Sequence, residues 1–184
     1  MAITFELFIE CRESAEADEV AAHFAGREHV LLNGKRVKWS IRREDTPGGF
    51  GLSISSPALS KYGVRTVQDA VEMTEAGLHL FHHLKTAPPF RFARAAQESS
   101  LIRLAELADF FEKDLRGVTH TSLDCVLDQE LYDQLGQPTL FGPFRPGYFW
   151  HHYTGEVYKP MGSNDQPALD DICRKLFPGE YYKY

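Results

Sequence analysis

The chain has 184 residues, of which 43% are hydrophobic and 25% are charged. This length and composition predict one globular domain with a substantial core, and they exclude a largely disordered chain. The formal net charge of −6 argues against broad electrostatic binding to nucleic acid or to an anionic membrane. The acidic excess lies in residues 93–184, which suits a protein whose partner is a basic protein.

Cysteine usage and hydropathy predict a cytoplasmic protein. The three cysteines, Cys11, Cys125 and Cys173, are widely spaced and form no CxxC motif, so neither a disulfide framework nor a zinc knuckle is expected. The first residues lack the basic region and apolar stretch of a signal peptide. No apolar run in the sequence reaches the roughly 18 residues that a membrane span needs.

The first half of the chain predicts a sheet with two helices. Apolar and polar residues alternate along 3–10 and again along 35–43, a spacing typical of strands with one buried face. Asn33-Gly34 is a strong hairpin signal, so residues 29–32 are expected to pair with the strand that follows. The expected elements are strand 3–10, helix 13–24, strands 29–32, 35–43 and 50–55, helix 66–85 and strand 90–95.

The long helix is predicted from a cap at Thr66 and from an apolar stripe at helical spacing between Val67 and Phe81. The order of elements is β-α-β-β-β-α-β. It predicts a split βαβ or ferredoxin-like arrangement with one added strand.

The second half predicts a mixed extension of this sheet. The expected elements are helix 100–115, strand 122–127, helix 129–135, a hairpin within 141–158 that turns at Thr154-Gly155, and helix 168–176. We therefore expect an α+β fold: a mostly antiparallel sheet with helices packed on one face, plus a C-terminal helix and hairpin extension. A single domain over 1–184 is expected, and a division into a 1–96 sandwich core and a 97–184 extension is the alternative.

Basic side chains form a strip on the polar side of the strand at 35–43, namely Arg36, Lys38 and Arg42. Glu6 and Glu10 project from the polar side of the first strand. If the two strands are neighbours, opposite charges across them neutralise the strip. An anion site on an open sheet face is the alternative, although no phosphate-binding motif accompanies the strip.

The polar face of the long helix carries possible metal ligands. Glu75, His79 and His83 lie one turn apart, and two imidazoles at i,i+4 can chelate one metal ion. The HExxH motif is absent, and a tight site needs a further ligand from a second element. The histidines that could supply that ligand are His120, His151 and His152. Two interpretations stay open: a helix face that points into water, or a divalent transition metal such as zinc at these three residues.

Two other segments favour core packing over chemistry. Cys125 alternates with Leu123 and Leu127, so its thiol is expected in the core and not as a nucleophile. The Gly-Phe-Gly segment at Phe50 is expected to bury its ring beside Leu52. Since a buried ring cannot stack on bases, RNA binding is not expected.

Residues 144–153 hold an unusual density of Tyr, Trp, Arg and His. Aromatic residues and arginine are enriched at the hot spots of protein interfaces. A small satellite core, in which a hairpin packs on the sheet, is the alternative. The candidate partner-binding residues are Arg145, Tyr148, Trp150, His151, His152 and Tyr153.

The leading hypothesis is a soluble, non-enzymatic protein-binding module, of the kind that masks or inhibits a partner as bacterial immunity proteins do. It needs no cofactor. The second hypothesis is a metal- or histidine-dependent hydrolase that uses the Glu75, His79 and His83 face of the long helix. The third is a structural assembly component. The sequence leaves the partner, the substrate and the oligomeric state open.

Overall fold

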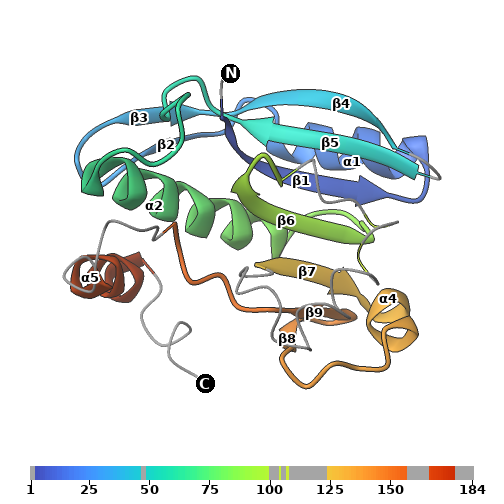
Figure 1. Ribbon diagram of the computed structural model, residues 1–184. Helices are drawn as coiled ribbons and strands as arrows, with labels where there is room; N and C mark the ends of the chain where they lie inside the picture. The colour runs from blue at the N-terminus through green and yellow to red at the C-terminus, as the bar shows by residue number, and fades with distance from the viewer. Residues whose placement is uncertain are drawn as a thin grey trace.

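The computed structural model describes residues 3–46, 49–99, 104, 107, 124–156 and 166–176. Its main feature is a seven-stranded antiparallel sheet with the strand order β4-β5-β1-β6-β7-β9-β8 (Figure 1). Strands β2 and β3 form a separate two-stranded antiparallel ribbon, which we call the β2–β3 ribbon.

The strands are β1 (Phe5–Cys11), β2 (Glu28–Val30), β3 (Arg36–Lys38), β4 (Ser40–Thr46), β5 (Gly49–Ser55), β6 (Phe92–Gln97), β7 (Cys125–Asp128), β8 (Gly142–Arg145) and β9 (Tyr148–Trp150). The helices are α1 (Ser14–Phe24), α2 (Val67–Leu84), α4 (Gln129–Gln134) and α5 (Gln166–Leu176). The α+β class with a mostly antiparallel sheet is thus confirmed. The ferredoxin-like description of the first half stays a prediction.

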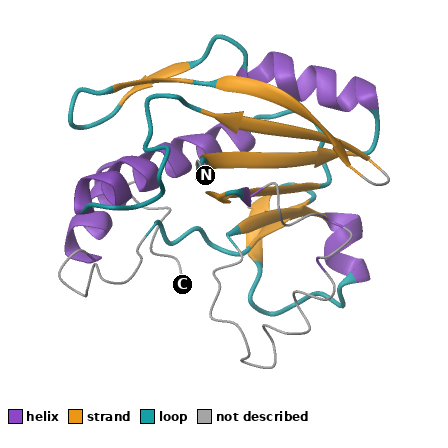
Figure 2. Cartoon of the chain, turned by 45° about the horizontal axis from the view of Figure 1, so that its top comes forward, coloured by secondary structure: helices purple, strands orange, loops and turns teal. Residues whose placement is uncertain are grey.

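Strand β1 lies inside the sheet and is buried on both faces, so the prediction of a single buried face for this strand is wrong. Leu7 packs in a large cluster with Phe24 of α1 and Leu80 of α2, so both long helices lie on one face, as predicted (Figure 2). Phe8 points to the opposite face, where it joins a smaller cluster with Leu131 of α4. The sheet is continuous from the first half of the chain into the second, because β6 pairs with β7.

The strand predicted at 35–43 divides into two strands that belong to different sheets. β3 ends at Lys38 and pairs with β2, whereas β4 begins at Ser40 and pairs with β5. Val37 and Trp39 are buried in the large cluster as the alternation predicts. The alternation persists through the break because it reports which side chains face the core, and not which strand is the neighbour.

Phe50 is 43% exposed, so the prediction that its ring is buried with Leu52 is wrong. Phe50 is the second residue of β5 and pairs with Cys11 at the last position of β1. Leu52, two residues further along β5, is fully buried. Period-two alternation gives the face of a side chain, but burial also needs a covering element at that position.

The predicted neutralisation of the basic strip by Glu6 and Glu10 is also wrong. Arg36 and Lys38 lie on β3 of the separate ribbon, and Arg42 lies on β4, which β5 separates from β1, so no part of the strip neighbours β1. Glu6 and Glu10 are buried in the sheet, and Glu6 accepts a hydrogen bond from the Ser53 hydroxyl at 2.5 Å. The ion pairs of the strip are local: Arg36 with Glu28 across the ribbon, and Arg42 with Glu44 along β4.

The C-terminal hairpin turns earlier than predicted. β8 and β9 are joined at Pro146-Gly147, where Gly147 has a φ of +76°, and Thr154-Gly155 follows the hairpin. A positive φ favours glycine, and either Gly-containing pair satisfies that rule in the sequence. Helices α4 and α5 confirm the helices predicted at 129–135 and 168–176. The helix predicted at 100–115 lies, apart from residues 104 and 107, outside the described residues.

Candidate functional site

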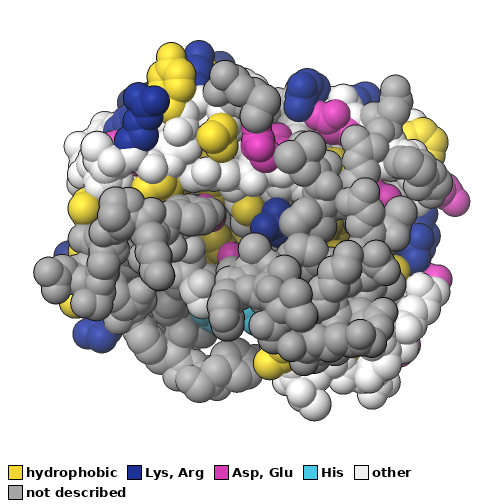
Figure 3. All heavy atoms as spheres, in the orientation of Figure 1, with side chains coloured by type: hydrophobic (Ala, Val, Ile, Leu, Met, Phe, Trp, Pro, Cys, Tyr) yellow, Lys and Arg dark blue, Asp and Glu magenta, His cyan; other side chains and the backbone are white. Residues whose placement is uncertain are grey.

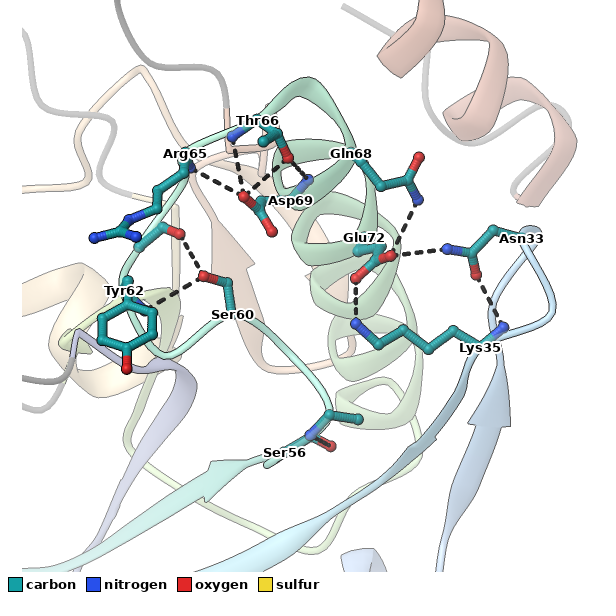
Figure 4. Close-up of polar contacts among 12 residues, drawn as sticks. Asn33, Lys35, Ser56, Ser60, Tyr62, Arg65, Thr66, Gln68, Asp69 and Glu72 are labelled. Atoms are coloured by element: carbon teal, nitrogen blue, oxygen red, sulfur yellow. Dashed lines mark hydrogen bonds and ion pairs between the residues drawn. The ribbon is translucent and has the colours of Figure 1, made fainter.

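Helix α2 is the element on which the candidate site is built. The Thr66 hydroxyl accepts a hydrogen bond from the Asp69 N–H at 3.1 Å, and the Asp69 carboxylate accepts one from the Thr66 N–H at 3.0 Å (Figure 4). This capping box satisfies two donors at the start of the helix and confirms the cap predicted at Thr66. Val67 in the first turn is 44% exposed, but between Ala70 and Leu84 most side chains are buried.

The turn of the β2–β3 ribbon covers the carboxylates of α2. Glu72 accepts hydrogen bonds from the Asn33 side-chain amide at 2.8 Å and from the Lys35 ammonium at 2.6 Å (Figure 4). Glu75 accepts a hydrogen bond from the Leu32 N–H at 2.8 Å. Both carboxylates are buried, and this burial raises the pKa of Glu75 above its ordinary value. The prediction that this helix face points into water is therefore wrong.

Four histidines meet at the base of the ribbon, and we call His23, His29, His79 and His83 the histidine cluster. The rings of His29 and His79 stack with their centroids 4.2 Å apart, and the Nε2 atoms of His29 and His83 lie 2.7 Å apart. His23 Nε2 lies 3.1 Å from the His83 carbonyl oxygen, and Arg27 Nη1 lies 3.1 Å from His83 Nδ1. The cluster thus joins α1, the ribbon and α2.

The hydrogen-bond partners assign the protons of the His29–His83 pair. A guanidinium only donates, so His83 Nδ1 accepts from Arg27 and carries no proton. His83 Nε2 therefore carries the proton and donates it to His29 Nε2, and both rings are neutral. Burial, followed by the neighbouring bases, lowers the pKa of His79 and of His83 to about 4. Burial also lowers the pKa of His23 and His29.

The metal site predicted at Glu75, His79 and His83 gains no support from this geometry. Within the described part of the chain, no three His, Cys, Asp or Glu side chains are placed to hold a metal ion. Glu75 binds the ribbon's turn, and the two histidines contact His29. Of the suggested further ligands, His151 and His152 follow β9, and His120 lies outside the described residues.

Two of the candidate partner-binding residues contact the end of α2 and the loop after it. The Arg145 guanidinium donates to the carbonyl oxygens of Leu84 at 3.0 Å, of Pro88 at 3.3 Å, and of Ala87. It also lies over the Tyr148 ring, 4.0 Å from the centroid. The Tyr148 hydroxyl in turn donates to the Phe90 carbonyl oxygen at 2.9 Å. Both side chains therefore serve the packing of this chain.

The other four candidates also make internal contacts. Tyr153 is fully buried against Gly77 of α2 and donates to the Glu156 carboxylate at 3.0 Å. The Trp150 ring lies 5.9 Å from Phe81 of α2, measured between centroids. The His152 ring lies 4.5 Å from Trp150, and the His151 N–H donates to the Cys125 carbonyl oxygen. The alternative of a hairpin packed on the main fold explains these contacts, and partner binding by the six residues stays a prediction.

The cysteines that the structure describes lie in the core. Cys125 is fully buried in the smaller cluster, which confirms its predicted place, and this burial raises the pKa of its thiol. Burial and two nearby carboxylates raise the pKa of Cys11 to about 12. A thiol with a raised pKa holds little of the reactive thiolate at neutral pH.

Comparison of the chain with models of known protein families, with curated proteins and with solved structures finds no match. Within the described residues, no helix is both long enough and apolar enough to cross a bilayer.

The ribbon's outer face is the feature that sequence reasoning missed. His29, Leu31, Val37 and Trp39 point inward, so the side chains between them point outward. Val30 is 58% exposed and Leu32 is 56% exposed. The signal was present in the sequence, since the Asn33-Gly34 turn sets the register and the alternation then assigns the faces. The outward-facing side chains are those of Glu28, Val30, Leu32, Arg36 and Lys38.

Proposed function

We propose that this chain is a non-enzymatic protein-binding module that binds its partner through the outer face of the β2–β3 ribbon. The observation that carries the proposal is the exposure of two neighbouring aliphatic side chains, Val30 and Leu32, on one face of a short ribbon. Grouped apolar side chains on a polar-rimmed surface are typical of interaction sites.

The polar border of this face indicates the kind of partner. Arg36 lies opposite Val30, and Lys38 lies opposite Glu28. Arg36, Lys38 and Glu28 are exposed, and one of the two cations is paired with the carboxylate. An apolar partner surface bordered by acidic groups complements this arrangement, so the proposed partner differs from the basic one expected from the acidic excess of residues 93–184. In Figure 3, basic and hydrophobic side chains lie near one another at the upper left, the end of the molecule where Figure 1 places β2 and β3.

The ribbon's inner side supports the proposal because it holds the binding face in place. Leu31, Val37 and Trp39 are buried in the large cluster, and buried Glu72 and Glu75 bind the turn. A face that is already ordered before binding loses little conformational entropy on association.

The experiment compares three forms of the protein as bait in an extract of the cells that encode it. The wild type is compared with the Val30→Ser/Leu32→Ser variant and with a matched control, Phe50→Ser/Leu140→Ser. The control removes two apolar side chains that are 43% and 54% exposed elsewhere. We expect one protein to be retained by the wild type and the control, and to be retained at least about tenfold less by the ribbon variant.

Equal retention by the ribbon variant and the wild type would contradict the proposal, as would the failure of the wild type to retain any protein. The immunity- or inhibitor-type role predicted from the sequence has its own readout: inhibition of the retained partner's activity by the wild type.

A further inference from the structure

We infer that the seat of the β2–β3 ribbon on α2 is acid-sensitive: uptake of one proton by the His29–His83 pair breaks a contact that holds the ribbon and loosens it. The structural part of this inference stands alone. Its functional part, loss of partner binding on acidification, rests on the proposed function.

The geometry leaves no place for a further proton in the pair. In the neutral pair, His83 Nε2–H donates to His29 Nε2 across 2.7 Å. A proton added to His29 Nε2 sets two N–H groups against each other at that distance. A proton added to His83 Nδ1 instead faces the Arg27 guanidinium, 3.1 Å away, which is also a donor. Every placement of the added proton therefore breaks one of the two contacts.

The groups around the pair make a positive charge there unfavourable. His79 stacks on His29, and His23 lies at the His83 carbonyl. The further groups whose charge acts on the cluster are Arg27 from the α1–β2 connection, His82 from α2 and Arg145 from β8. All of them are bases, so each opposes protonation of the cluster while the ribbon is seated.

The direction of the pH effect follows from linkage. A ring with an ordinary pKa of 6.5 and a pKa of about 4 when the ribbon is seated binds its proton preferentially in the loosened state. One such ring shifts the ratio of loosened to seated ribbon about 20-fold between pH 7 and pH 5. Glu75 acts in the opposite sense, because its raised pKa favours proton uptake in the buried, seated state. The acid response therefore belongs to the histidines.

The Leu32 amide reports on the seated ribbon because it donates to Glu75 on α2. Its hydrogen-exchange protection factor, corrected for the intrinsic effect of pH, is compared with that of Ile9 in β1. In the wild type we expect the protection of Leu32 to fall at least about tenfold more than that of Ile9 between pH 7 and pH 5. In the His29→Gln/His83→Gln variant, which lacks the pair but keeps His79 and His23, we expect the extra fall at Leu32 to be much smaller than in the wild type.

The matched control is His152→Gln. The pKa of His152 is also lowered by burial, and this ring packs on Trp150 of β9. We expect it to keep the wild-type response of Leu32. The inference is overturned if Leu32 follows Ile9 in the wild type, or if the double variant responds to acid as the wild type does. If the ribbon of the double variant is not seated on α2, the test uses the wild type alone. NMR then follows protonation of the His29 and His83 rings as the pH falls. The inference is overturned if these rings take up protons while the Leu32 amide stays protected.

A binding measurement separates the two proposals. With the retained partner in hand, we expect the wild type to lose at least about tenfold in affinity between pH 7 and pH 5, and the double variant to lose less. If the Leu32 amide loses protection in acid as expected but no partner is found, only the proposed function is contradicted. If a partner binds through Val30 and Leu32 but the Leu32 amide shows no acid-dependent loss of protection, only the acid sensitivity of the ribbon is contradicted.

Discussion

Two hairpins contact helix α2, and they do so with different chemistry. The β2–β3 ribbon is seated through buried carboxylates and the histidine cluster, and it leaves Val30 and Leu32 in water. The β8–β9 hairpin and the residues after it use an arginine at the end of α2 and the Tyr153 ring against Gly77. The β8–β9 hairpin packs its aromatic side chains against its own chain, whereas the β2–β3 ribbon, which has fewer aromatic residues, has the exposed aliphatic face.

This difference shows why composition alone misplaces an interface. Aromatic side chains and arginine bury well against any complementary surface, whether it belongs to a partner or to the same chain. The contacts of Arg145, Tyr148 and Tyr153 are all with their own chain. Exposure after folding is the property that marks a surface for a partner, and it is set by which faces remain uncovered.

Acid is expected to have the largest effect on this comparison, because it acts at once on several rings that surround the contact between the β2–β3 ribbon and α2. The pKa of His79 and His83 is lowered from 6.5 to about 4 in the folded protein, so the unfolded chain binds more protons between these values. Stability should therefore fall as the pH drops from 6.5 towards 4. Urea midpoints at pH 7, 6, 5 and 4 check this. The His79→Gln/His83→Gln variant should lose less than the wild type over that range, and parallel curves would contradict the assignment.

Gly77→Ala tests the aromatic side of α2. A Cβ at Gly77 would lie 2.6 Å from atoms of the buried Tyr153 ring. Overpacking costs roughly 1–3 kcal/mol, and an approach as close as 2.6 Å to a buried ring places this case at the upper end of that range. The better helix propensity of alanine offsets about 1 kcal/mol, so we expect a net loss of about 2 kcal/mol in the free energy of unfolding. Urea unfolding measures it. In a Tyr153→Leu background the same change should cost less, and an equal cost in both backgrounds would show that the close approach is not the cause.

Arg145→Lys should cost about 1.5 kcal/mol in the free energy of unfolding. The guanidinium donates to one carbonyl oxygen at the end of α2 and to two in the loop after it, and a lysine ammonium cannot reproduce that planar set of donors. The matched control is Arg36→Lys on the exposed ribbon face, which should change stability by no more than about 0.5 kcal/mol. Thermal or urea unfolding compares the two, and a cost at position 36 as large as at 145 would remove the distinction between the hairpins.

Val30→Ser should have the smallest effect on stability, within about 0.5 kcal/mol, because most of the side chain is already in water. The same change should weaken partner binding. Urea unfolding alongside the retention assay checks both results. A loss of more than about 1 kcal/mol in stability would mean that Val30 serves packing and not binding.

Local rules in the sequence predicted much of the architecture. The strand at 3–10, the Asn33-Gly34 turn and the cap at Thr66 each depend on neighbours in the chain, and each is found in the structure. The place of Cys125 in the core followed from the alternation along its strand. The turn of the last hairpin was misplaced because two Gly-containing pairs fit it equally well by local rules.

The sequence by itself determined the α+β class, because backbone periodicity and turn chemistry are local properties. The tertiary structure alone decided which polar residues are covered and which apolar residues are left out. Glu75, His79 and His83 have the spacing of an exposed helix face, yet the ribbon returns from 43 or more residues away in the sequence to cover them. No local sequence pattern encodes the contact between the ribbon and α2, since it depends on where a hairpin distant in the sequence packs in the folded chain.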